Sequence, residues 1–110
     1  MLLTVQKGTN TKMYARVAVY TFTPGGADTV IERARTGMLP IFRRHAGFRR
    51  YFVIKTGENA GYSISIWDSE AQANEAVQAA AQWVKDNVAD LIAPATNHVG
   101  NVAFNEGPAS

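Results

Sequence analysis

The sequence predicts a protein of the α+β class with one four-stranded sheet, on the basis of three observations. Residues 48–55 and 62–67 are rich in aromatic and β-branched side chains, and glycine and asparagine lie between them, which is typical of a β-hairpin. A helical pattern precedes this hairpin and another follows it, and each is flanked on its outer side by a further strand pattern. This β-α-β-β-α-β order is that of the ferredoxin-like fold, in which right-handed crossovers place both helices on one face of an antiparallel sheet.

Composition limits the classes of protein that the chain can represent. At 110 residues with 46% hydrophobic and 18% charged residues, it is expected to form one globular domain. The absence of cysteine excludes disulfides, thiolate nucleophiles and cysteine-ligated metals, and is compatible with the reducing cytoplasm. We expect neither a signal peptide nor a membrane span, and a net charge of +2 is too small to indicate nucleic-acid binding by itself.

The first expected elements are a strand and a kinked helix. Residues 1–12 are interpreted as an N-terminal arm, with a marginal strand at residues 2–6, and the first firm strand spans residues 13–22. The Thr23-Pro-Gly-Gly segment ends this strand, and apolar residues then recur at helical spacing. Pro40 is expected to kink or interrupt the helix, and Gly47 to cap its C-terminus.

The hairpin leads into a second helix and a last strand. Ser69-Glu-Ala-Gln is a capping box that opens the helix, and Pro94 is expected to end it. Residues 98–104 form the fourth strand, weakened by Gly100, and residues 105–110 a C-terminal tail, so the domain itself spans residues 13–104. Since both helices lie on one face, the other sheet face would be bare and apolar, and we expect a homodimer whose sheets pack face to face.

Three segments resemble the antibiotic biosynthesis monooxygenase-like family of dimeric α/β-barrels. They are Phe22-Thr-Pro-Gly-Gly, Ala46-Gly-Phe and Ile66-Trp-Asp-Ser-Glu-Ala, and the resemblance extends over about residues 13–104. The family includes cofactor-free monooxygenases acting on aromatic polyketides, haem-degrading enzymes, quinol oxygenases and many members of unknown role. Fold alone does not choose among these functions.

The resemblance carries over to few individual residues. In monooxygenase members a tryptophan at the position of Trp67 lines a pocket between sheet and helices; the asparagine expected four residues earlier is Ser63 here, and the tyrosine expected six residues later is Ala73. Haem-degrading members place an asparagine on the first strand and a histidine on the following helix. Neither residue occurs in the corresponding segments, which disfavours haem degradation.

Five residues are candidates for substrate binding in a pocket under the helices: Trp67, Ser63, Ser65, Arg16 and Tyr20. Strand alternation places Ser63 and Ser65 on the face of Trp67, and the resemblance orients the even-numbered residues of the first strand toward the same space. Trp67 alternatively fills the corner between sheet and helix, which is the commoner role of such a residue. A buried arginine needs an anion or access to solvent, so Arg16 could meet an anionic ligand.

Other polar residues have simpler interpretations. His45 could act as a general base but suits the last turn of a helix, and His98 has no acidic partner at a suitable spacing. No group of residues has metal-ligand spacing. Four arginines, Arg43, Arg44, Arg49 and Arg50, form a basic corner that could bind RNA, although the RNA-recognition pattern has glycine where this chain has arginine and belongs on the third strand.

These observations lead to three functional hypotheses. The first is a cytoplasmic, cofactor-free monooxygenase that oxidises a phenolic or anthrone-like substrate, with Trp67 and Tyr20 holding the ring and Arg16 or Ser63 stabilising a developing phenolate. The second is a non-catalytic, small-molecule-binding or stress-related dimer whose pocket is mostly filled. The third is an RNA-binding module. The first two hypotheses are favoured over it, so we expect no nucleic-acid partner, and we also expect no membrane partner.

Overall fold

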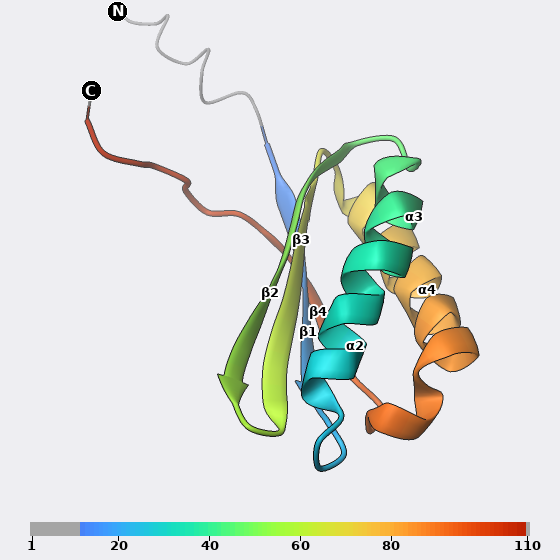
Figure 1. Ribbon diagram of the computed structural model, residues 1–110. Coiled ribbons are helices and arrows are strands. Elements are labelled where there is room, and N and C mark those ends of the chain that lie inside the picture. The colour runs from blue at the N-terminus through green and yellow to red at the C-terminus, as the bar shows by residue number, and fades with distance from the viewer. Residues whose placement is uncertain (1–11, 110) are drawn as a thin grey trace, which may run out of the picture.

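The protein adopts the predicted ferredoxin-like α+β fold (Figure 1). The computed structural model describes residues 12–109. In chain order the elements are β1 (Tyr14–Thr21), α2 (Ala27–Arg33), the π-helical turn η1 (Ala34–Met38), α3 (Leu39–Arg43), β2 (Phe48–Gly57), β3 (Ala60–Trp67), α4 (Glu70–Asn87), the 3₁₀ turn η2 (Ala89–Leu91) and β4 (Thr96–Asn101). The expected strand at residues 2–6 lies outside the described residues.

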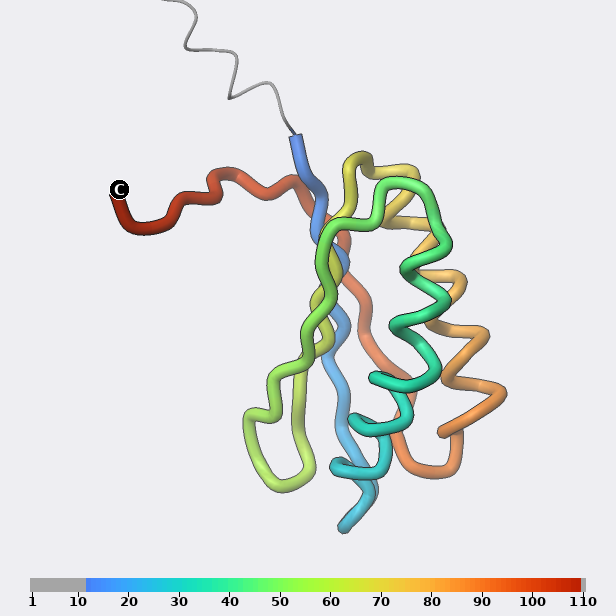
Figure 2. Tube along the Cα trace, turned by 45° about the horizontal axis from the view of Figure 1, so that its top comes forward, coloured from blue at the N-terminus to red at the C-terminus, as the bar shows by residue number. Residues whose placement is uncertain are grey.

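The four strands form one antiparallel sheet in the order β2-β3-β1-β4, and the helices cover one of its faces (Figures 1 and 2). The register places Arg16 opposite Ser65, and Ala18 between Ser63 and Asn97. These residues are therefore neighbours on the helical side of the sheet, as strand alternation requires.

The first helical segment is interrupted at the predicted place. Pro40 lies in the first turn of α3, directly after the π-helical turn η1. Proline has no N–H to donate to the preceding turn, so regular α-helical bonding cannot continue through this position. The prediction that Gly47 caps this helix is wrong, because α3 ends at Arg43 and its C-cap is Arg44. Gly47 lies in the turn that leads into β2, and its φ of 82° is in the left-handed region that glycine tolerates best.

The second helix begins as predicted but ends earlier. Ser69 is the N-cap, and its hydroxyl accepts a hydrogen bond from the Gln72 backbone N–H at 3.2 Å. The prediction that α4 continues to Pro94 is wrong, because Val88 leaves helical geometry with φ of −138° and the side chain of Asn87 donates to the Trp83 carbonyl at 2.9 Å. The chain then turns back, and Ile92 forms a β-bridge with Phe22.

The last strand is displaced from its predicted position. It spans Thr96–Asn101 rather than residues 98–104, because its register is set by pairing with β1 from Val19 to Tyr14. The hairpin strands are also longer than expected, because their pairing extends to Gly57 and Ala60 next to the turn. These differences arise from long-range pairing, which local residue patterns do not determine.

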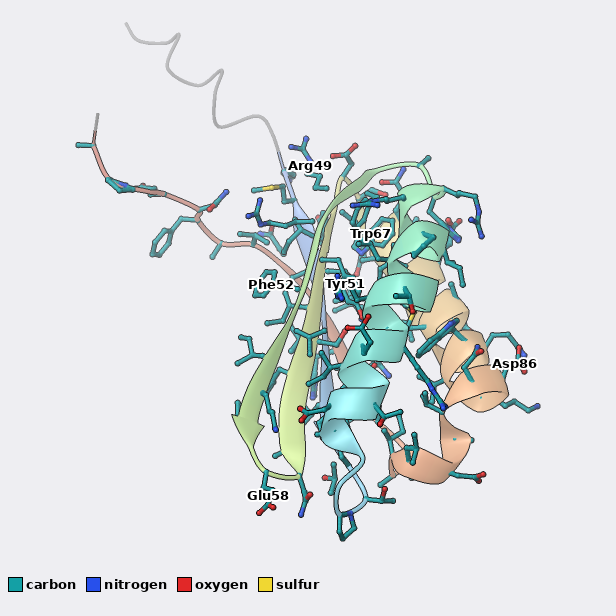
Figure 3. The ribbon with its side chains drawn as sticks, in the orientation of Figure 1. Arg49, Tyr51, Phe52, Glu58, Trp67 and Asp86 are labelled. Carbon is teal, nitrogen blue, oxygen red and sulfur yellow. The ribbon has the colours of Figure 1, made fainter. Side chains whose placement is uncertain are left out.

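Both faces of the sheet carry apolar side chains, but they differ in what covers them. The helical face forms the core with α4, whose residues Ala73, Ala76, Ala80 and Trp83 are buried. The opposite face, called the outer face here, carries Val17, Val19, Phe52, Ile54, Tyr62 and Ile64. Phe52, Ile54 and Tyr62 are 42%, 42% and 39% exposed. Figure 3 shows Phe52 on this outer face and Tyr51 on the helical side.

Candidate functional site

A fully buried arginine lies at the centre of the helical face of the sheet. Arg16 on β1 donates from Nε to Ser65 Oγ at 3.0 Å, from Nη2 to Ser63 Oγ at 2.7 Å and from Nη1 to Asn97 Oδ1 at 3.2 Å. Its guanidinium carbon lies 5.4 Å from the centre of the Phe42 ring. Within residues 12–109, Arg16 forms no ion pair with a carboxylate. Its positive charge is therefore held by neutral oxygens and an aromatic face, an arrangement that leaves the charge uncompensated.

Trp67 lies beside this arginine in a packed aromatic cluster. Its indole Nε1 donates to Ser65 Oγ at 2.9 Å, so the Ser65 hydroxyl accepts from both Trp67 and Arg16. The ring is fully buried and makes edge-on contacts with Phe42 and His45 at centroid distances of 5.3 and 6.2 Å. Trp67 thus holds Ser65 in position and fills the space between β3 and α3 (Figure 3).

Tyr51 extends the polar network on the β2 side. Burial raises the pKa of its hydroxyl to about 12, and a hydrogen bond with Ser63 together with the charge of Arg16 partly opposes this rise. The Tyr51 ring packs edge-on against Phe42, with 5.0 Å between the ring centroids. The hydroxyl therefore stays protonated at neutral pH and acts as a hydrogen-bonding group rather than as a base.

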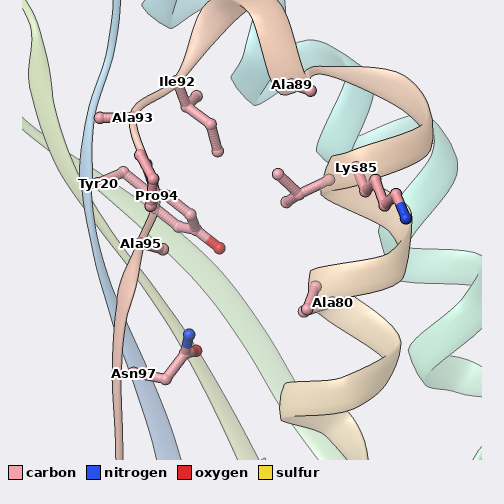
Figure 4. Close-up of a pocket in the computed structure, with 11 residues that line it drawn as sticks. Tyr20, Ala80, Lys85, Ala89, Ile92, Ala93, Pro94, Ala95 and Asn97 are labelled. Atoms are coloured by element: carbon pink, nitrogen blue, oxygen red, sulfur yellow. The ribbon is translucent and has the colours of Figure 1, made fainter.

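A pocket of about 380 Å³ opens next to this network, between α4 and the segment that leads into β4 (Figure 4). Its wall on the α4 side includes Ala80 and Val84, and its other wall includes Ile92 and Ala95. Tyr20 and Asn97 contribute polar groups, and Figure 4 shows both side chains directed toward the space between β4 and α4. The mainly apolar wall with a few polar groups is typical of a small-molecule site.

Asn97 connects the pocket with the buried charge. Because an arginine can only donate hydrogen bonds, the amide oxygen of Asn97 must face Arg16, and the Nδ2 group is its remaining donor. The pocket therefore has an amide N–H donor on a side chain whose oxygen is hydrogen-bonded to a buried cation. Such a donor favours a ligand oxygen that carries or develops negative charge.

The five predicted site residues all lie on the helical face, but they occupy different parts of it. Tyr20 lines the pocket, whereas Arg16, Ser63 and Ser65 lie behind Asn97 in the polar network. Trp67 is not among the residues that line this pocket. The space beside Trp67 is occupied by aromatic rings, which agrees with its interpretation as a corner-filling residue.

Three further residues of this region, Asn97, Tyr51 and Phe42, were not predicted from the sequence. Asn97 was left outside the fourth strand, yet its alternation with Val99 is the signal that would have placed both on one face. Tyr51 alternates with Val53 in the same way on β2. Phe42 belongs to the apolar stripe of the first helix, and its contact with Arg16 has no signal in the sequence.

The remaining candidates lie away from the pocket. His98 is exposed and pairs with Val17, so it faces outward, and the residues that the structure describes contain no cluster suited to a metal ion. All four arginines of the basic corner are exposed, and Arg49 forms an ion pair with Asp68 that reduces the net positive charge there. No helix among residues 12–109 is long and apolar enough to cross a membrane.

Comparison with known proteins identifies the family. The model of the antibiotic biosynthesis monooxygenase family matches residues 13–85, which is most of the chain. The chain belongs to the antibiotic biosynthesis monooxygenase family. The match includes Arg16, Tyr20, Ser63, Ser65 and Trp67 but stops before β4, and therefore before Asn97. No curated protein sequence is significantly similar to the chain.

Solved structures of family members and related proteins share the fold. A protein of unknown function from Nitrosomonas europaea is 18% identical, with a TM-score of 0.74 and coverage of 91% of this chain and 98% of that one. The ActVA-Orf6 monooxygenase of Streptomyces coelicolor, solved with nanaomycin D, is 15% identical, with a TM-score of 0.72 and coverage of 91% and 96%. SnoaB, a cofactor-independent oxygenase from Streptomyces nogalater, is 17% identical, with a TM-score of 0.61 and coverage of 87% and 96%. At these identities the likeness establishes the fold alone.

Proposed function

We propose that this family member is a cofactor-independent monooxygenase that oxidises a small phenolic or anthrone-like substrate in the pocket beside Tyr20 and Asn97. The observation that carries the proposal is the hydrogen bond between the buried Arg16 cation and Asn97, a residue of the pocket wall. A positive charge nearby lowers the pKa of a bound phenol, because it stabilises the phenolate. A family model and oxygenase neighbours of the same fold support this choice of chemistry.

The proposed reaction requires dioxygen as the oxidant. The acidic substrate loses a proton to solvent, and its anion transfers one electron to dioxygen. The substrate radical and superoxide recombine to form a carbon–oxygen bond, and the resulting peroxide anion takes up a proton from solvent to give a hydroperoxide. Loss of water then converts the original methylene group into a carbonyl. One oxygen atom enters the substrate and the other leaves as water with the two hydrogens of the methylene group.

The protein's contribution is to bind and polarise the substrate. Tyr20 and Asn97 would donate hydrogen bonds to the developing oxyanion, and Arg16 would increase the donor strength of Asn97 from behind. Ser63 and Ser65 hold the guanidinium in place, and Trp67 in turn holds Ser65. Arg16, Ser63, Ser65 and Trp67 are therefore positioning residues in this proposal, whereas Tyr20 and Asn97 would touch the substrate oxygen and the apolar lining would contact its rings.

The test is oxygen uptake with 1,8-dihydroxyanthrone as substrate and the purified protein without added cofactor. We expect uptake of one dioxygen for each anthraquinone formed, above the rate with heat-denatured protein. Asn97→Ala should reduce the rate about tenfold to a hundredfold, since one oxyanion donor is lost. Arg16→Met should reduce the rate as well while the fold is retained, because an apolar side chain of similar length replaces an uncompensated charge.

The matched control is Arg44→Met, which removes an exposed arginine far from the pocket and should leave the rate unchanged. Binding of the anthrone without oxygen uptake would instead support a non-catalytic small-molecule-binding protein. Equal activity of Asn97→Ala and the wild type would contradict the proposed site even if turnover occurs.

We also propose that a second copy of the chain covers the outer face of the sheet. Phe52, Ile54 and Tyr62 are large apolar side chains that solvent reaches in the isolated chain, and neighbouring strands place them next to one another. An apolar face of this kind is typical of an interface. Sedimentation equilibrium at micromolar concentration should give twice the chain mass, and Ile54→Asp should shift it toward the monomer; a monomeric wild type would contradict this.

A further inference from the structure

A second, smaller cavity, called the inner cavity here, adjoins the proposed substrate pocket. Its volume is about 20 Å³, close to that of a single water molecule, and all the residues around it are apolar or aromatic. It shares Tyr20, Val84 and Ile92 with the larger pocket. These three side chains, which come from β1, α4 and the segment after η2, therefore form a common wall between the two spaces.

The inner cavity is also lined by the π-helical turn η1 and by α4. Ala34 and Met38 of η1 contribute to the lining together with Trp83 of α4. Gly37 fixes the distance between these elements, because a Cβ atom at this position would lie 2.8 Å from Trp83 Nε1. Trp83 consequently packs directly against the helix backbone. The short side chain of Ala34 then leaves a gap that the surrounding residues do not fill.

We propose that this inner cavity is an alkyl subsite of the substrate pocket, so that the preferred substrate is a phenolic ring system with a short alkyl substituent. The inference rests on the proposed function and adds the substrate class to it. A ring whose oxygen is bound by Asn97 would point its opposite edge along the wall toward Val84 and Ile92. An apolar substituent on that edge would displace these side chains slightly and enter an apolar cavity, where its burial is favourable.

The inference makes Val84 and Ile92 determinants of substrate length. Val84 is half-buried and ends between the two spaces, so shortening it should join them. Met38 can adapt on the far side, since its flexible unbranched side chain fills irregular gaps with little strain. Neither the shortening of Val84 nor a rearrangement of Met38 affects the polar end of the pocket at Asn97.

The test compares the binding of 2-naphthol and 6-propyl-2-naphthol by calorimetry. The Val84→Ala variant should bind the propyl compound about tenfold more tightly relative to 2-naphthol than the wild type does, because about two additional methylene groups become buried. Val88→Ala is the matched control: this valine lies a little further along the chain, is buried and lines neither cavity, so the ratio of the two affinities should stay the same.

A second measurement locates the alkyl group. The chain has two tryptophans, so two indole N–H signals are expected in an ¹⁵N spectrum, and Trp83→Phe assigns them. The propyl compound should shift the Trp83 signal in the Val84→Ala variant, while 2-naphthol leaves it unchanged. An unchanged affinity ratio, or no selective shift of Trp83, overturns the alkyl subsite while the proposed function stands. Failure of the wild type to bind either naphthol overturns both.

Discussion

The space between the sheet and α4 is filled at one end and hollow at the other. At the filled end, Trp67 and Phe42 pack against each other beside Ala73 and Ala76. At the hollow end, Ala80 faces a pocket of about 380 Å³. The helix presents the same small side chain at both ends, so the difference is due to the residues on the opposite wall.

This comparison shows how a regular helix can support two different functions. Alanine gives α4 a high helix propensity and a shallow surface from Ala71 to Ala81. Large rings from β3 and α3 fill the space at one end and build a rigid core around the Arg16 network. At the other end the chain enters β4 through Pro94 and Ala95, which are too small to fill the space, and a cavity results.

The largest effect is expected at the filled end. Trp67→Ala should lower the free energy of unfolding by about 3–5 kcal/mol, because it leaves a large cavity in a tightly packed region. Trp67→Phe should cost less, since most of the ring volume remains. Urea denaturation monitored by circular dichroism measures both. For comparison, Val84→Ala at the hollow end should lower the free energy of unfolding by about 1 kcal/mol or less. If Trp67→Ala lowers it by no more than Val84→Ala does, the proposed difference between the ends is contradicted.

Substitutions at the hollow end should change ligand affinity rather than the stability of the fold. Ala80→Leu adds a side chain that projects into the pocket and should weaken the binding of 2-naphthol at least about tenfold, with little change in melting temperature. Ala71→Leu provides the control, because Ala71 is exposed on the same helix and does not line the pocket. If both variants bind alike, the pocket is not the ligand site.

A smaller effect is expected from the titration of Tyr51 in the filled end. Its pKa is raised from the usual value near 10 to about 12, so unfolding makes the hydroxyl easier to ionise. The stabilising contribution is fully present below pH 10 and is lost as the pH rises from about 10 to 12. Denaturation curves over this range should fall more steeply for the wild type than for Tyr51→Phe, and parallel curves would contradict the raised pKa.

The smallest effect is expected outside both ends, at the basic corner. Replacing Arg49 and Arg50 with alanine should not change the affinity for a single-stranded RNA oligonucleotide, because we expect no specific binding at physiological salt. Fluorescence anisotropy at two salt concentrations is sufficient to test this. Micromolar affinity that falls steeply with salt and is lost in the variant would restore the RNA-binding hypothesis.

Local signals in the sequence predicted most of the fold. Ser69 marks the start of α4 through capping chemistry that depends on only a few neighbouring residues. Alternation along β3 placed Ser63 and Ser65 on the face of Trp67, and the family resemblance placed Arg16 of β1 on that face as well, where the three residues are hydrogen-bonded. These predictions succeeded because each depends on interactions within one element or between paired strands.

The features that escaped prediction depend on contacts between distant segments. The apolar stripe of α4 continues beyond Asn87, yet the helix stops there, and Ile92 instead pairs with Phe22, directly after β1. Asn97 gains its place beside Arg16 only through the register of β4 on β1. Whether a space is filled or hollow depends on the combined volume of side chains from three or more elements. Residue periodicity within one element contains no information about that combined volume.

The buried charge of Arg16 has opposite consequences for the two halves of the proposed reaction. A positive electrostatic potential at the pocket makes a phenol easier to deprotonate, but it also binds the resulting electron pair more firmly and raises the one-electron reduction potential of the substrate radical. Transfer of an electron to dioxygen then becomes less favourable, although the superoxide that forms is itself stabilised by the same potential. The interposed Asn97 amide keeps the guanidinium one hydrogen bond away from the pocket. This separation would moderate the potential, so that acidity is gained without the substrate becoming too weak a reductant for dioxygen.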